Sequence, residues 1–180
     1  FVVTNAASTE VSGFELDAAF QATEKLRLTL SFGTVDGEYS EFRGAACTEL
    51  QAADIAFANF VTPGGLTPNS PNITSADGKC AQLFDSAGRP TGTAQDLSGR
   101  AIEQDGYSGS FGAQYVQPLG SMNWFTEIDV NFIDDYLMTG DLDPLDMQEG
   151  FEIINLRTGL RGENWMLMLY GRNITDENFA

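Results

Sequence analysis

The stretch Lys25-Leu26-Arg27-Leu28-Thr29-Leu30-Ser31-Phe32-Gly33 alternates strictly between polar or small residues and large apolar residues. Successive side chains of a β-strand point to opposite faces, so this pattern predicts a strand with one apolar and one polar face. A helix would need apolar residues at i, i+3, i+4 and i+7, which this stretch does not have. It therefore predicts an all-β fold.

The same alternation of period two recurs along the chain and predicts six strands in all. Three connections between them are only a few residues long, at Ala22–Glu24, Pro118–Ser121 and Gly162–Asn164. One short helix is expected within a loop, at Thr48–Phe60. The predicted strands are Val11–Phe20, Lys25–Val35, Gly106–Gln117, Met122–Tyr136, Phe151–Arg161 and Trp165–Asn173.

The lengths of the connections alternate between short and long. The second and third strands are joined by about Asp36–Asp105, and the fourth and fifth by about Leu137–Gly150. Short turns on one side and long loops on the other are typical of an outer-membrane β-barrel. The strand lengths also match the roughly 9–11 residues that a tilted strand needs to cross a bilayer. We therefore expect an antiparallel transmembrane barrel, in which the strands follow one another as an up-and-down meander.

The polar faces of these strands carry many charges, which would be costly inside a dry core but not beside a water-filled lumen. Trp124 and Trp165 lie beside short turns, and Phe20 lies near a third, where an aromatic girdle is expected. A soluble amphipathic sheet can show the same pattern. The charged residues of the polar faces are Glu15, Asp17, Lys25, Arg27, Glu127, Asp129 and Arg157.

The composition excludes several classes of function. The chain has 9 Lys and Arg against 26 Asp and Glu, a formal net charge of −17, so we expect no nucleic-acid binding. It contains no histidine, which excludes Ser-His-Asp and Cys-His catalysis and His-bearing zinc sites. The first residues show neither an initiator Met nor the start of a signal peptide, so the chain is expected to be a fragment or a processed product.

The two cysteines, Cys47 and Cys80, lie in a segment of loop composition and are not part of a CxxC motif. We expect a disulfide, which would place the protein in an oxidising compartment such as the periplasm or the cell exterior. Two free thiols of a cytosolic protein are the alternative. The sequence alone leaves the bond itself open.

Carboxylates are frequent, but their spacing indicates no enzyme and no metal centre. In Asp141–Asp146 the EF-hand pattern fails, because Leu145 and Asp146 occupy its fifth and sixth positions. A looser calcium site and a solvated acidic loop both stay open there, and we expect the second. The pairs Glu15/Asp17 and Glu127/Asp129 are spaced i, i+2, which is the spacing of lumen-lining residues rather than of a general acid and base.

Three segments together resemble one known family. Trp165–Glu177, which contains Asn173-Ile174-Thr175-Asp176, resembles the penultimate-strand signature of TonB-dependent outer-membrane receptors. Ala6–Leu16 is similar to a strand with the pattern A-x-S-x-G-x-E in that family, and Gln95–Arg100 resembles one of its loop-to-strand passages. The order and spacing of the three segments are more specific than any one of them.

The resemblance implies a barrel of roughly 22 strands with a plug in its lumen. Residues 1–180 would be the C-terminal portion of that barrel, with 37–105 as a long extracellular loop insertion and with the plug and the final strand absent. It also implies energised uptake of a scarce nutrient across the outer membrane of a Gram-negative bacterium. The partners would be outer-membrane lipid, the TonB complex through the missing plug, and a siderophore, cobalamin, oligosaccharide or similar ligand that the sequence does not identify.

No cofactor is expected, and the candidate ligand contacts are few. Tyr39, Phe42, Tyr136 and Asp141 lie near the expected outer ends of strands, where aromatic rings stack on ligands and carboxylates bind hydroxyl groups. The alternative is that these side chains only pack the bases of the loops. The alternative function is a secreted or periplasmic all-β ligand-binding module, similar to a lectin.

Overall fold

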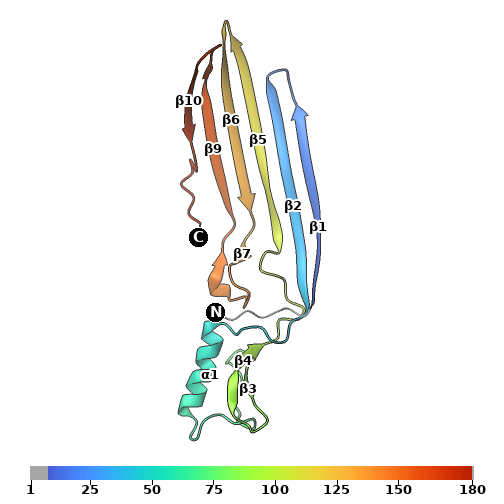
Figure 1. Cartoon of the computed structure of the whole chain (residues 1–180), viewed down its shortest axis with the longest axis vertical. Helices are drawn as coiled ribbons and strands as arrows, with labels where there is room; N and C mark the ends of the chain where they lie inside the picture. The colour runs from blue at the N-terminus through green and yellow to red at the C-terminus, as the bar shows by residue number, and fades with distance from the viewer. Residues whose placement is uncertain (1–7, 180) are drawn as a thin grey trace. The chain divides into compact units, whose positions relative to one another are not determined.

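The computed structural model describes residues 8–179 and is all-β apart from one α-helix and a 3₁₀ turn. Its main element is a six-stranded antiparallel sheet in the order β1-β2-β5-β6-β9-β10, seen side by side in Figure 1. The predicted all-β class and the antiparallel meander of six strands are therefore confirmed, whereas the transmembrane barrel stays a prediction. The strands are Ser8–Gln21, Leu26–Glu41, Gly106–Leu119, Met122–Ile133, Phe151–Arg161 and Met166–Gly171.

Two predicted strands are clearly wrong at their ends. The strand predicted to stop at Val35 continues as β2 to Glu41, into the segment predicted as a loop insertion. Met122–Tyr136 was expected to be continuous, but β6 stops at Ile133, and Tyr136–Leu137 (β7) pairs separately with Met147–Gln148 (β8). The carboxylate of Asp134 accepts a hydrogen bond from the backbone N–H of Asp135 at 3.0 Å. Local bonds of this kind compete with the ladder, and they end the strand here.

The described chain divides into two compact units. We call residues 12–36, 104–136 and 148–179 the sheet unit, and residues 8–11, 37–103 and 137–147 the loop unit. The segment 37–105, predicted as a loop insertion, supplies most of the second unit. Its extracellular location stays a prediction. Among the described residues, no helix is long and apolar enough to cross a membrane.

The register of the sheet unit sorts its side chains into an apolar face and a polar face. Leu30 is paired with Phe111, Phe111 with Val130, and Val130 with Ile154, so apolar residues form a continuous row across four strands. Tight turns fix this register, and Gly120 in the β5–β6 turn has φ 64°, a left-handed conformation that glycine adopts at little cost. A one-residue slip would exchange the two faces.

Glycine also shapes the apolar face. A Cβ on Gly109 would lie 2.6 Å from Cζ of Phe132, so only glycine lets that ring lie across β5. The ring centroids of Phe32 and Phe132, on either side of Gly109, are 6.5 Å apart.

The loop unit contains helix α1, Glu49–Val61, and a hairpin of β3, Cys80–Phe84, with β4, Pro90–Gln95. Thr48 and Gln51 form a capping box at the start of α1, which explains why the predicted helix begins there. Cys47 and Cys80 form a disulfide with their Cα atoms 5.7 Å apart, as predicted. Cys80 belongs to a small buried cluster with Ile55, Ala58 and Leu66.

Candidate functional site

A row of polar side chains, three of them charged, crosses the polar face of the sheet unit. Arg27 is paired with Gln114, Gln114 with Glu127, Glu127 with Arg157, and Arg157 with Tyr170. Directly opposed residues on one face have Cβ atoms about 4.5–5.5 Å apart, so neighbouring side chains in the row can meet. The row therefore runs across five strands.

Hydrogen bonds and ion pairs orient the middle of this row. The Gln114 amide donates to Glu127 at 2.6 Å, and Nε of Arg157 forms an ion pair with the same carboxylate. A second guanidinium nitrogen of Arg157 lies 3.9 Å from Asp129. Half-exposed pairs of this kind contribute less than about 1 kcal/mol to stability. Their main effect is to hold Arg157 in one orientation on an open polar surface.

A groove adjoins the row where β9 meets β10. It has a volume of about 500 Å³ and is lined by Asn155, Arg157, Tyr170 and Arg172, among others. The guanidinium of Arg172 lies 5.9 Å from the ring centroid of Tyr170, a cation–π contact. Guanidinium groups, a phenol and an amide supply both donors and acceptors, so the groove suits a small ligand with hydroxyl or carboxylate groups.

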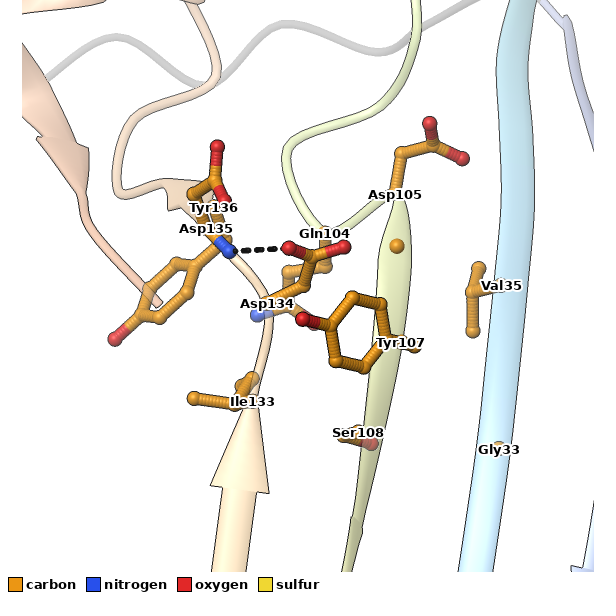
Figure 2. Close-up of a pocket in the computed structure, with 11 residues that line it drawn as sticks. Gly33, Val35, Gln104, Asp105, Tyr107, Ser108, Ile133, Asp134, Asp135 and Tyr136 are labelled. Carbon is orange, nitrogen blue, oxygen red and sulfur yellow. Dashed lines mark hydrogen bonds between the residues drawn. The ribbon is translucent and has the colours of Figure 1, made fainter. Parts of the chain in front are cut away.

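A second pocket, of about 280 Å³, lies at the ends of β5 and β6 away from their connecting turn (Figure 2). Its lining includes Asp105, Asp134 and Asp135, together with Tyr107 and Tyr136, and no basic residue of the described chain. Tyr136, a predicted ligand contact, thus lines a pocket of the sheet unit. The three Asp side chains in this lining make the pocket acidic, which disfavours anionic ligands.

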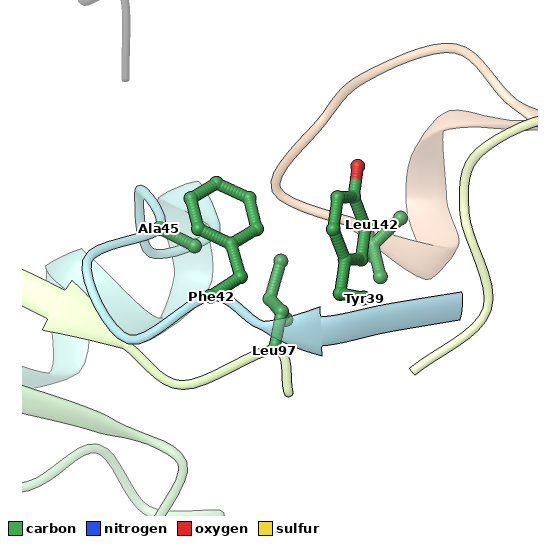
Figure 3. Close-up of a cluster of buried hydrophobic side chains, with 5 residues drawn as sticks. All are labelled: Tyr39, Phe42, Ala45, Leu97 and Leu142. Atoms are coloured by element: carbon green, nitrogen blue, oxygen red, sulfur yellow. The ribbon is translucent and has the colours of Figure 1, made fainter. Parts of the chain in front are cut away.

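The structure gives Tyr39 and Phe42 a packing role. They are only 7% and 6% exposed, and they lie in a cluster of the loop unit with Ala45, Leu97 and Leu142 (Figure 3). Their ring centroids are 4.9 Å apart. Neither ring has a free face for stacking, so their role as ligand contacts stays a prediction that this arrangement does not support.

The hydroxyl of Tyr39 donates a hydrogen bond to the carboxylate of Glu103 at 2.8 Å. Burial, and then the hydrogen bond and charge of Glu103, raise the pKa of Tyr39 to about 12. Tyr39 belongs to the loop unit, beyond the part of β2 that pairs with β5, and its hydroxyl remains a neutral hydrogen-bond donor at physiological pH.

The acidic segment 141–146 uses its carboxylates for local turns. Asp143 caps the 3₁₀ turn Pro144–Asp146 by accepting from the N–H of Leu145 at 2.9 Å, and Asp146 accepts from Thr139 at 3.0 Å. Asp141, a predicted ligand contact, is half-buried, and its backbone oxygen accepts from Gln95 at 2.8 Å. Among the described residues, no group of three acidic or cysteine side chains is placed to hold a metal ion.

The motif Asn173-Ile174-Thr175-Asp176 forms a closed turn directly after β10. The side-chain amide of Asn173 donates to the backbone oxygen of Glu177 at 2.8 Å and accepts from the backbone N–H of Glu177 at 2.9 Å. Asn173 and Asp176 have φ of 47° and 56°, a conformation that Asn and Asp tolerate better than most residues. The backbone N–H of Ile174 donates to Ile154 at 2.9 Å, which ties the turn to β9. The motif thus ends the strand.

Asn173→Ala is expected to loosen this turn. The change removes both side-chain bonds to Glu177 and places alanine at a positive φ, at a cost of about 1–2 kcal/mol. Hydrogen exchange of the Ile174 amide should then become about tenfold faster or more, since 1.4 kcal/mol corresponds to a factor of ten. Asn178→Ala is the control, because the amide of Asn178 makes only a 3.4 Å bond to Asp176. Equal exchange in the two variants would contradict this role of Asn173.

A carboxylate in the loop unit, that of Asp77, is held by three donors. They are the hydroxyl of Ser75, the amide of Gln51 at 2.9 Å and the backbone N–H of Lys79 at 3.0 Å. These bonds lower the pKa of Asp77 from 3.8 to about 2. Because Gln51 belongs to α1, the charge of Asp77 helps to anchor the helix.

The anchoring of α1 is therefore expected to weaken in acid. The folded-state pKa of Asp77 lies below its ordinary value, so its stabilisation is present above about pH 4 and is lost as the pH falls towards 2. In the wild type, hydrogen exchange of the α1 amides should become faster as the pH falls from about 4 to 2, and Asp77→Asn should remove this pH dependence. Asp85→Asn, in the β3–β4 turn, is the control and should keep the pH dependence. If the pH dependence survives in Asp77→Asn, Asp77 is not the group that anchors α1.

Comparisons of the chain with protein-family models, with curated proteins and with solved structures gave no match.

Proposed function

We propose that this chain forms part of the wall of an outer-membrane β-barrel that takes up a scarce nutrient. The observation that carries the proposal is a six-stranded meander sheet with one exposed apolar face and one charged face. In this proposal the apolar face contacts lipid, and the row around Arg157 lines an aqueous lumen. The loop unit would lie on the outer side, and the chain would carry out no reaction.

The apolar face of the sheet unit has no protein cover among the described residues. Phe14, Leu30 and Phe111 are 58%, 37% and 39% exposed. Of the described residues of this unit, only Phe125 is a buried hydrophobic residue. A soluble sheet buries such a face against another layer, whereas a barrel strand presents it to lipid.

Aromatic residues gather near both ends of this face. Tyr115 and Trp124 make an edge-to-face contact at 5.8 Å near the β5–β6 turn. Near the other end, Phe32, Tyr107 and Phe132 have their centroids 6.3–6.5 Å apart. From Trp124 to Phe132 the strand rises roughly 26 Å at about 3.3 Å per residue. This separation resembles the apolar band of about 25 Å that lies between the aromatic girdles of outer-membrane barrels.

The few polar groups on the apolar face are paired with one another. The indole N–H of Trp124 donates to the hydroxyl of Thr158 at 3.0 Å, and the hydroxyls of Thr126 and Thr158 are 2.8 Å apart. Thr158 also donates to the backbone oxygen of Phe125 at 2.9 Å. Lipid offers no hydrogen-bond partners, so this internal pairing is what a lipid-facing surface requires.

Support for the uptake role comes from the resemblance of Trp165–Glu177 to TonB-dependent receptors and from the polar groove beside Arg157 and Arg172. The partners proposed are outer-membrane lipid, a small polar ligand, and the TonB complex through a plug. The groove's donors and acceptors suit a siderophore or an oligosaccharide equally well.

The location can be tested by cell fractionation. The full-length protein is expected in the outer-membrane fraction, and its migration on a denaturing gel should change on heating, because unheated barrels stay folded. Recovery as a soluble periplasmic protein whose migration does not depend on heating would overturn the proposal and favour the ligand-binding module. Uptake is tested separately, by comparing growth on single scarce nutrients with and without the gene.

A further inference from the structure

Helix α1 of the loop unit is apolar on two opposite sides. Ile55 and Ala58 face inward and are 1% and 9% exposed. On the other side Leu50, Phe57 and Phe60 are 62%, 66% and 85% exposed. A helix that is hydrophobic on all sides is normally buried on all sides. Nothing in the described part of the loop unit covers this second side of α1.

The exposed residues have the spacing of a helix-pairing seam. Leu50, Ala53, Phe57 and Phe60 follow one another at intervals of three, four and three, which are the a and d positions of a heptad. Val61, 52% exposed, widens the seam at its end. Over the 13 residues of α1 the seam is about 20 Å long. This pattern fits the apolar face of another helix of similar length.

Acidic residues border the seam on both sides. In the same heptad, Glu49 takes a g position and Asp54 an e position, the positions that select a partner by charge. Asp54 accepts from the N–H of Ala76 at 3.2 Å, which keeps its carboxylate beside α1. The helix contains no Lys or Arg. A second copy of this chain would bring like charges together, so self-pairing is disfavoured and a basic partner is favoured.

We propose that the exposed face of α1, Leu50, Ala53, Phe57, Phe60 and Val61, docks an amphipathic helix of a partner protein. That helix would carry apolar residues on one face, with Lys or Arg beside them. The proposal concerns the loop unit alone and does not depend on the membrane location of the sheet. The acidic border also opposes binding to anionic lipid.

The binding test uses the purified full chain and two synthetic two-heptad peptides as probes. Both peptides have Leu at a and d, and they carry either Lys or Glu at e and g. Fluorescence anisotropy should show binding of the Lys peptide that is at least about tenfold tighter than that of the Glu peptide and that weakens with salt. Equal affinities, no binding of either peptide, or binding of anionic vesicles instead would overturn the proposal.

Variants locate the interaction on α1. Phe57→Ser combined with Phe60→Ser should weaken binding of the Lys peptide about a hundredfold, since buried aromatic residues dominate such contacts. Leu83→Ser is the matched control, because Leu83 is 46% exposed in the same unit but lies on β3. Phe57 and Phe60 are both exposed, so the loop unit of the double variant should stay folded. Resistance of the Cys47–Cys80 disulfide to mild reduction verifies that it does. Unchanged binding by the double variant would refute the site.

Discussion

Replacing Cys47 and Cys80 together by alanine is expected to lower the free energy of unfolding of the loop unit by about 4 kcal/mol. The two residues are 33 positions apart, and the chain-entropy model gives about this value for a closed loop of that size. The unit depends on the bond because its buried clusters are small. Among the described residues, the cluster at α1 has Ile55, Ala58, Leu66 and Cys80 as its buried members.

Proteolysis of the segment between the two cysteines measures this effect. The variant should be cut there at protease concentrations that leave the oxidised wild type intact. Reduced wild type should behave like the variant, and reductant should not affect the variant further. Alanine is the appropriate replacement, because Cys80 is fully buried and serine would bury a hydroxyl. If oxidised wild type and variant resist protease equally, the bond does not stabilise the unit.

Replacing Leu30 with arginine is expected to prevent assembly of the protein in the outer membrane, whereas replacing Thr29 with arginine is not. The two residues are neighbours on β2 and point to opposite faces. In a barrel, arginine at mid-depth on the lipid face costs about 2–4 kcal/mol, and a lumen-facing arginine costs little. Heat-dependent gel migration and the yield in the outer-membrane fraction report assembly.

The same pair of variants distinguishes the two functional proposals. Leu30 is 37% exposed in the sheet, so in a soluble ligand-binding module arginine at this position would reach water and fold nearly as well as the wild type. Equal yields of Leu30→Arg and Thr29→Arg would therefore contradict the lipid-facing role of this face. A loss of outer-membrane yield for Leu30→Arg but not for Thr29→Arg would support the lipid-facing role.

The connections were predicted less completely than the strands. The hairpin of β3 and β4 was not predicted, because its strands are short and lack alternation. It is held by its turn, where Asp85 accepts from the N–H groups of Ala87 and Arg89 and Gly88 has a positive φ. The second apolar face of α1 was missed as well, although the spacing of Leu50, Ala53, Phe57 and Phe60 was a readable signal.

The sequence by itself determined the six strands of the main sheet apart from some of their ends, the short turns, and the separation into an apolar and a polar face. These features depend on neighbours within a few residues, through the two-residue period of a strand and the conformational preferences of turn residues. The disulfide partners were also determined, because the chain has only two cysteines.

Only the tertiary structure decided which distant side chains meet. Arg157 reaches Glu127 because the register of two strands aligns them, and a shift of one residue would have separated them. Tyr39 and Phe42 are buried because Leu97 and Leu142, far along the chain, pack against them. Local patterns fix the direction of a side chain, but contacts between remote segments fix its surroundings, and these decide whether an aromatic ring binds a ligand or fills a core.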